Sequence, residues 1–317
     1  MRDRWIGRSA LGRSFATSLV SSTAALLRQT ANSQRIERAS MHGTCQEIRG
    51  RLRRFLFFFS CSSLTPMPLP SPFTHLETRD TAHQSVAVWG DDAAIEFRVT
   101  GAIHAWWGRD QFLTGLAWDA ITAGLLSHPS GTPKSVLMLG LGGGTSLRTL
   151  RHLCPEVAIT AVEIDETMIG LAREYMHLDG IGIEVITGDA YAWLRKNRRK
   201  FDAIFDDVYG VTSTDVERPL ASPESLLPDL CRSLNHNGIF AANLVTGPGH
   251  RRVQTDFRRF FRENFEEVRS ITTPASLNEC LIGGSKLRPW QDIRTLAKEF
   301  PADADYSWWR QLRARRL

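Results

Sequence analysis

A glycine cluster and a later acidic residue stand where a nucleotide could bind. The apolar run Val136–Leu139 leads into the sequence GLGGG at 140–144, and a second apolar run, Val157–Val162, leads into Glu163. Glycines let a turn approach a ligand closely because no Cβ stands in the way. A carboxylate after the second run can accept hydrogen bonds from both hydroxyls of a ribose. The spacing predicts a nucleotide-binding strand–turn–helix–strand unit. Its candidate binding residues are Gly140, Gly142, Gly144 and Glu163.

Two further acidic positions follow apolar runs. Gly188-Asp189-Ala190 comes directly after the run 183–187, and Asp206-Asp207 comes after the run 201–205. Ligands of open parallel sheets bind past the carboxyl ends of the strands. We therefore expect the glycine turn, Glu163, Asp189 and Asp207 to converge on one cleft.

The elements that must position these residues alternate regularly along the chain. This order predicts an α/β fold with a doubly wound, mostly parallel, Rossmann-like sheet of seven strands, preceded by a small antiparallel β module. The seven strands are expected at 136–139, 157–162, 183–187, 201–205, 239–245, 267–272 and 279–282, and the module strands at 85–89, 93–99 and 102–107. Helices are expected at 112–126, 146–153, 166–176, 191–200, 224–234 and 251–264.

The domain organisation follows from composition. Residues 1–66 hold eleven arginines and three acids, a local charge of +8, whereas the whole chain of 317 residues carries +5, which leaves −3 for the remainder. We interpret 1–66 either as a disordered tail or as sequence upstream of a natural start at Met67, with a targeting peptide as the alternative. Residues 67–127 are expected to form the β module with a linking helix, and 128–317 the catalytic domain.

Charge and cysteine usage exclude several classes. Because the basic charge belongs to the first segment, the folded part lacks the overall basic character of a nucleic-acid-binding domain. No apolar run approaches the roughly 18 residues of a membrane span. Five cysteines are scattered without a metal-ligand spacing, which indicates no metal site and a cytoplasmic location. We expect no nucleic-acid or membrane partner.

The motifs together resemble the spermidine synthase family of polyamine aminopropyltransferases, within the class I methyltransferase fold. The matching runs are VLMLGLGGGTSLR, AVEIDETMI, EVITGDAYAWL and FDAIFDDVYG, with RDQF upstream, and the resemblance covers roughly 85–285. It implies that Glu163 holds the ribose of S-adenosylmethionine or its decarboxylated form, and that Asp189 and Ala190 meet the adenine. It further implies that Asp207 deprotonates an attacking amine, and that a homodimer could form through the β module, where Trp106 and Trp107 lie.

The chain departs from the family in the half of the site that would bind the amine. Gly143 and Gly210 stand where the family carries acids, and His104 lies near a family glutamine. Carboxylates that could replace the missing acids are Asp110, Asp119, Asp206 and Asp215.

Three functions are therefore weighed. The leading one is aminopropyl transfer to a small amine. The second is methyl transfer from S-adenosylmethionine to an unknown small acceptor, because a turn without the acid would not repel the methionine carboxylate. The third is a catalytically silent nucleotide-binding homologue. The loop 208–222 has the length and position of a lid over the site.

Overall fold

The computed structural model describes residues 73–212, 215–220 and 222–317, which belong to one compact unit. The predictions for 1–66 lie outside the described residues, and the boundary between 127 and 128 stays a prediction. Within the described ranges, no helix is long and apolar enough to cross a membrane.

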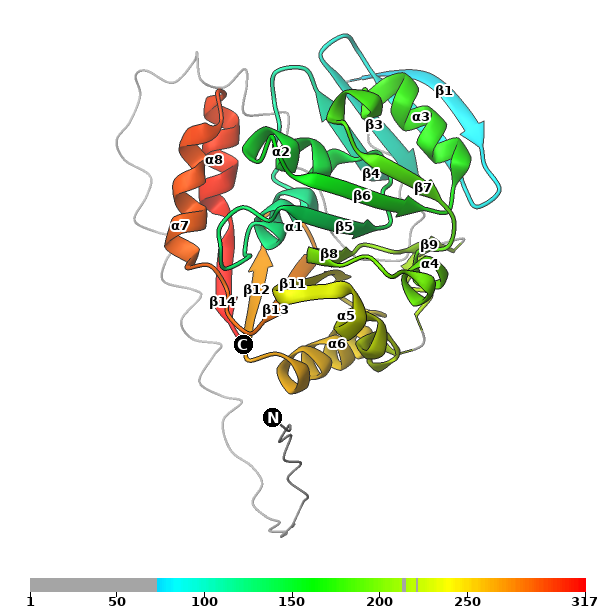
Figure 1. Ribbon diagram of the computed structural model, residues 1–317. Coiled ribbons are helices and arrows are strands. Elements are labelled where there is room, and N and C mark those ends of the chain that lie inside the picture. The colour runs from blue at the N-terminus through cyan, green and yellow to red at the C-terminus, as the bar shows by residue number, and fades with distance from the viewer. Residues whose placement is uncertain (1–72, 213–214, 221) are drawn as a thin grey trace, which may run out of the picture. The chain divides into compact units, whose positions relative to one another are not determined.

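An antiparallel sheet of four strands precedes the main fold, as predicted, with one strand more than the sequence indicated (Figure 1). Its strand order is β1-β2-β3-β4. One face is buried through Val86, Val88 and Phe97, which alternate with more exposed residues as a half-buried sheet requires. The strands are β1 Thr74–Asp80, β2 Ser85–Gly90, β3 Ala94–Val99 and β4 Ala102–Gly108.

The main sheet has eight strands in the order β14-β12-β13-β11-β8-β5-β6-β7, so the prediction of seven strands was wrong. The additional strand is β14, whose sequence Arg-Ala-Arg-Arg has no apolar pattern. It pairs only with β12, at the edge of the sheet, where charged side chains can remain in solvent. The strands are β5 Ser135–Leu139, β6 Ala158–Glu163, β7 Glu184–Thr187, β8 Phe201–Asp206, β11 Leu234–Val245, β12 Glu267–Thr272, β13 Asn278–Gly284 and β14 Arg313–Arg316.

Helices cover both faces of this sheet, so the central strands are apolar on both sides. Val136 and Met138 of β5 pack in the core beneath α1, α2 and α3, whereas Leu137 and Leu139 pack in a second core beneath α4, α5 and α6. The doubly wound, mostly parallel architecture is thereby confirmed. The helices are α1 Ala117–Leu125, α2 Thr145–Leu153, α3 Glu166–Met176, α4 Ala190–Lys196, α5 Leu227–Ser233, α6 Arg251–Asn264, α7 Trp290–Thr295 and α8 Asp303–Gln311, with short 3₁₀ helices η2 Leu178–Ile181, η3 Pro223–Leu226 and η4 Leu296–Glu299.

The helix expected at 112–126 begins five residues late, at Ala117. The backbone N–H groups of Phe112 and Leu113 donate to the carboxylate of Asp305 in α8, at 2.9 and 2.8 Å. Those of Thr114 and Gly115 donate to Asp119, at 3.0 and 2.7 Å. Two carboxylates thus hold this segment in a non-helical path, and one of them comes from a distant helix that local sequence cannot reveal.

Three other predicted boundaries moved for local reasons. The helix expected at 191–200 ends at Lys196, because the Asn197 side chain bonds the backbone of Arg199. The helix expected at 224–234 is divided into η3 and α5. The strand expected at 239–245 begins earlier, at Leu234, and Asn237-Gly238 lie inside it, where the pairing with β8 is irregular between Leu234 and Ile239.

The order of the central strands creates a crevice. The chain runs from β5 outward through β6 to β7 and then returns to place β8 on the other side of β5. Such a reversal separates the loops that follow β5 and β8, and ligands of doubly wound sheets bind there. The loops carrying the predicted site residues all leave the sheet at this edge.

Candidate active site

The glycine turn after β5 lies directly against the residue that follows β8. Gly140 has a φ of 81°, and a Cβ added there would stand 2.6 Å from the carbonyl oxygen of Asp207. Only glycine avoids that overlap. The N–H of Asp207 donates to the carbonyl of Leu139 at 2.9 Å, which joins the two strand ends. Gly142 and Gly144 complete the turn, and Gly144 is the N-cap of α2.

Glu163, at the end of β6, holds this turn in place. Its Oε2 accepts from the N–H groups of Leu141 and Gly142, at 2.8 and 3.0 Å. Its Oε1 accepts from the N–H of Asp165 at 3.1 Å. A carboxylate offers about four lone-pair sites, so the half-buried side chain retains capacity for a ribose hydroxyl. Glu163 therefore braces the turn, a structural role that the sequence did not indicate.

Asp189 and Ala190 lie one strand further along, where β7 leads into α4. Asp189 is exposed and is the N-cap of α4, with Oδ1 accepting from the N–H of Ala192 at 2.7 Å. Ala190 is buried. The N–H of Gly188 donates to the carbonyl of Glu163 at 2.8 Å, which fixes this turn beside Glu163. Capping uses one carboxylate oxygen of Asp189 and is compatible with its predicted contact to adenine.

Asp207 stands at the β5–β8 crevice in an environment that favours its neutral form. Burial raises the pKa of Asp207 to about 7, although the hydrogen bond from Asn243 and the positive charge of Arg218 both lower it. The Asn243 amide donates to its Oδ1 at 2.8 Å. A carboxyl with a pKa close to neutral can both accept and release a proton, as a general base must.

A buried ion pair behind Asp207 was not predicted. Arg218, from the loop after β8, contacts Asp206 at 2.7 Å, and the two side chains are 1% and 0% exposed. Tyr191 donates to Asp206 at 3.0 Å, and Arg218 donates to the carbonyl of Asn243. Because Asp206 is enclosed and paired, it cannot be one of the carboxylates that bind the amine. An arginine in a polar loop has no sequence signal that distinguishes it from a solvated one.

The other candidate carboxylates are not assembled around Asp207. Asp119 is 1% exposed and holds the 114–115 backbone. Asp215 is exposed and contacts His250 at 3.1 Å, in the hairpin formed by β9 Gly210–Val211 and β10 Val216–Glu217. Asp110 is exposed, without a contact that would direct it to the site. The nucleotide half of the predicted site is therefore brought together, and the set of acids for a diamine is not.

Thr145 and Gly143 fix the β module on the glycine turn. The Thr145 hydroxyl accepts from the N–H of Trp106 and donates to its carbonyl, both at 2.9 Å. A Cβ at Gly143 would stand 2.4 Å from Cβ of Ala105 and 2.4 Å from Sδ of Met176. The position at which the family carries an acid is thus filled by β4 and α3, and no side chain fits there.

Gly143→Ala is expected to destabilise the protein by about 1–3 kcal/mol, because the added methyl group overpacks the contact with Ala105. Gly170→Ala is the matched control. Gly170 lies inside α3 with open space around it, so alanine there should stabilise by up to about 1 kcal/mol. Chemical denaturation of both variants measures the difference, and equal effects of the two substitutions would contradict the packing argument.

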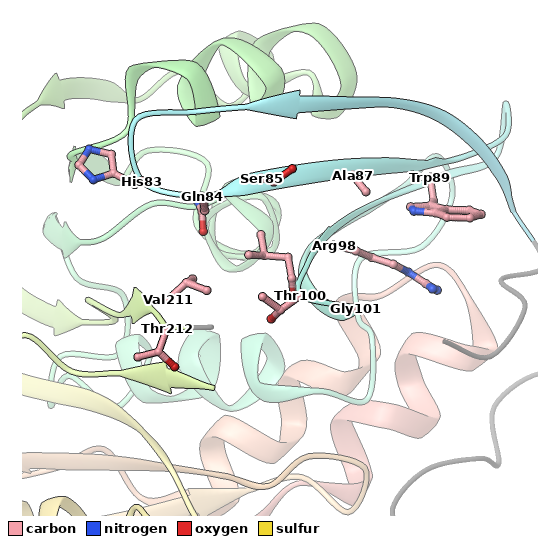
Figure 2. Close-up of a pocket in the computed structure, with 11 residues that line it drawn as sticks. His83, Gln84, Ser85, Ala87, Trp89, Arg98, Thr100, Gly101, Val211 and Thr212 are labelled. Carbon is pink, nitrogen blue, oxygen red and sulfur yellow. The ribbon is translucent and has the colours of Figure 1, made fainter. Parts of the chain in front are cut away.

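An open cavity of about 520 Å³ lies between the β module and the loop after β8 (Figure 2). Its wall includes Trp89 of β2 and Arg98 of β3, and on the other side Val211 and Thr212 at the start of the β9–β10 hairpin. No predicted site residue lines it. Arg98 is paired with Glu96 at 2.7 Å. The cavity therefore adjoins the loop that carries Asp207 but is distinct from the crevice between β5 and β8.

Within the ranges that the structure describes, no group of three or more His, Cys, Asp or Glu side chains is placed to hold a metal ion.

Comparison with known proteins agrees with this geometry. The spermine/spermidine synthase domain model matches residues 120–277. A polyamine aminopropyltransferase of Thermococcus onnurineus is 36% identical over 47% of this chain and 53% of its own length. A polyamine aminopropyltransferase of Chromobacterium violaceum is 29% identical, over 53% and 64%, and a probable one of Bifidobacterium longum is 34% identical, over 43% and 29%. The chain thus spans less than two thirds of each of these relatives.

Solved structures show the same fold. A probable spermidine synthase of Corynebacterium glutamicum has a TM-score of 0.56 at 19% identity, and covers 66% of this chain and 80% of its own. Human methyltransferase-like protein 13 has a TM-score of 0.51 at 22% identity, and covers 58% and 92%. The chain therefore shares the fold of these structures, and its residues 120–277 are similar to the spermine/spermidine synthase domain.

Proposed function

We propose that this chain is an aminopropyltransferase that takes the aminopropyl group of decarboxylated S-adenosylmethionine and transfers it to a small amine. The observation that carries the proposal is the meeting of the glycine turn, Glu163 and Asp207 at the β5–β8 crevice. The domain match at 120–277 and the aminopropyltransferase relatives support it. A spermidine synthase of the same fold, with a TM-score of 0.55 at 19% identity, is in complex with the transition state analogue AdoDATO; it covers 72% of this chain and 80% of its own.

In this proposal, Glu163 binds the ribose and the loop with Asp189 and Ala190 faces the adenine. The acceptor nitrogen bonds to the aminopropyl carbon next to sulfur, the C–S bond breaks, and its electron pair leaves a neutral thioether. The nitrogen gives up one proton to Asp207. Alignment of the two substrates and removal of this proton are the main tasks of the protein, because the sulfonium is already a good leaving group.

The packing at Gly143 limits how the substrate tail is held. With Ala105 and Met176 filling the space of the missing acid, the turn contributes backbone but no side chain to the tail.

The acceptor is limited by a different observation, because Asp119, Asp206 and Asp215 are engaged elsewhere and are not assembled around Asp207. We infer that the acceptor is a small amine that needs fewer carboxylates than a diamine does, since an unpaired buried ammonium is costly.

Calorimetric binding of the full chain to S-adenosylmethionine and to its decarboxylated form tests the proposal. We expect tighter binding of the decarboxylated form, followed by release of the thioether nucleoside when amines are added. Tighter binding of S-adenosylmethionine would overturn aminopropyl transfer in favour of methyl transfer. Binding of neither would leave a catalytically silent member of the fold.

The proposal includes a cytoplasmic location and a homodimer through the β module. The half-buried Trp106 and Trp107 of β4 support the second point, because aromatic side chains are enriched at interfaces. Sedimentation that shows only monomer at micromolar concentration would count against the dimer.

A further inference from the structure

The hydrogen bond on Asp207 is the end of a chain of polar groups. Asn243 of β11 is 7% exposed and donates from its amide nitrogen to Oδ1 of Asp207 at 2.8 Å. Its amide oxygen accepts from the amide nitrogen of Asn278 at 3.1 Å. The Asn278 oxygen in turn accepts from the hydroxyl of Ser276 at 2.5 Å. Three side chains from two segments thus lead to one carboxylate oxygen.

This chain fixes the orientation of the Asn243 amide. A free asparagine could turn either its NH₂ group or its oxygen toward Asp207, and the oxygen would repel a carboxylate. Because Asn278 donates to the oxygen, the NH₂ group must face Asp207. The sheet register makes this contact possible: Asn243 pairs with Cys280, so Asn278, two residues along β13, is its diagonal neighbour on the same face.

The backbone of Asn243 is held as firmly as its side chain. Its carbonyl accepts from the hydroxyl of Tyr209 at 2.8 Å and from Arg218. The loop after β8 therefore holds β11 in place at Asn243, the residue that contacts Asp207. Among the described residues, none donates a hydrogen bond to the second oxygen of Asp207, Oδ2.

We propose that Asn243, oriented by Asn278, is a positioning residue that occupies Oδ1 of Asp207 and presents Oδ2 as the atom that takes the proton of the acceptor amine. The inference rests on the proposed function. The ionisable groups that face Asp207 from the surrounding elements are Glu163 of β6, Asp206 of β8, Arg218 and Tyr209 of the following loop, and Cys280 of β13. Of these groups, Arg218 stabilises the ionised carboxylate by its charge. The amide of Asn243, which is not ionisable, donates a side-chain hydrogen bond to it.

The test is a carboxyl-carbon NMR titration of ligand-free full-length protein, together with the pH dependence of turnover. Asn243→Leu keeps the volume and removes the donor. We expect it to raise the pKa of Asp207 from about 7 to about 8 and to lower kcat at pH 7 about fivefold, because the ionised fraction falls from about one half to about one tenth. KM for the amine should be nearly unchanged. Asn278→Leu should act in the same direction and less strongly, because the Asn243 amide is then free to turn.

Asn235→Leu is the matched control. Asn235 donates to Asp202 at 2.8 Å and joins the same two strands, β11 and β8, at their other end. It should leave the Asp207 titration and the pH profile unchanged. Wild-type values for Asp207 in both Asn243→Leu and Asn278→Leu would overturn the inference. If no acceptor is turned over by the wild-type protein, the proposed function fails, and the NMR titration still decides whether Asn243 controls Asp207.

Discussion

Asp207→Asn is expected to lower kcat of amine alkylation by about a thousandfold, within the usual range for loss of a general base. The amide is close in shape to the carboxyl group and can still accept the hydrogen bond from Asn243. It cannot take up the proton of the amine. Steady-state kinetics with the amine that the wild type uses would measure the loss.

The pH dependence of kcat in the wild-type protein should report the ionisation of Asp207. Because the base is active when ionised and burial raises the pKa of Asp207 to about 7, kcat should rise from pH 5 toward pH 8. At pH 5 only about 1% of the carboxyl groups are ionised, so the rate there should be about a hundredfold below the plateau. In Asp207→Asn this rise of kcat between pH 5 and pH 8 should be absent.

As pH rises, the contribution of Asp207 to folding stability should fall, whereas kcat should rise. The pKa of folded Asp207 lies above its usual value of 3.8, so its contribution to stability is complete below pH 3.8 and is lost as pH rises through 7. Asp207→Asn should therefore be at least as stable as the wild type at pH 8. Asp92→Asn, in an exposed turn of the β module, should change neither property. A variant with unfolded structure, or with full turnover, would contradict the role of Asp207.

Arg218→Met is expected to cost about 3–5 kcal/mol of folding free energy, because it leaves the Asp206 carboxylate buried without its partner. Burial by itself would lower the pKa of Arg218, but the adjacent Asp206 raises it well above the usual value, so the guanidinium stays charged. Methionine retains much of the side-chain length beside Tyr209 and Phe257, whose rings lie 4.6 and 4.9 Å from the guanidinium carbon. Urea unfolding at pH 8 measures the loss.

A second substitution separates charge from packing. Asp206→Asn in the Arg218→Met background removes the unpaired carboxylate and should recover part of the stability. Arg259→Met, which breaks an exposed pair with Glu224 at 3.3 Å, should cost no more than about 1 kcal/mol. Equal losses of folding free energy for Arg218→Met and Arg259→Met would show that burial does not determine how much the Arg218–Asp206 pair contributes to stability.

The sequence by itself determined most of the elements and the placement of one half of the candidate site. Apolar runs of strand length, separated by amphipathic segments, lead to a doubly wound sheet, and in such a sheet the residues after the strands must share one edge. Hence Gly140, Glu163, Asp189 and Asp207 could be assigned to one crevice before any contact was known. The strand β14 could not be predicted in this way, because its sequence has no apolar pattern. It becomes a strand by pairing with β12 at the edge of the sheet.

Only the tertiary structure decided what surrounds Asp207. Asn243, Asn278 and Arg218 are polar residues without a periodic pattern, and each acquires its role from a partner brought in by strand pairing or by the loop after β8. Gly143 likewise stands where the sequence comparison led us to expect an acid, and the space that its side chain would need is filled by Ala105 and Met176. Local patterns report burial and backbone freedom, which are properties of a residue and its neighbours along the chain. Pairing of polar groups and competition for space depend on residues distant in sequence, and these are set when the sheet and its loops close around the crevice.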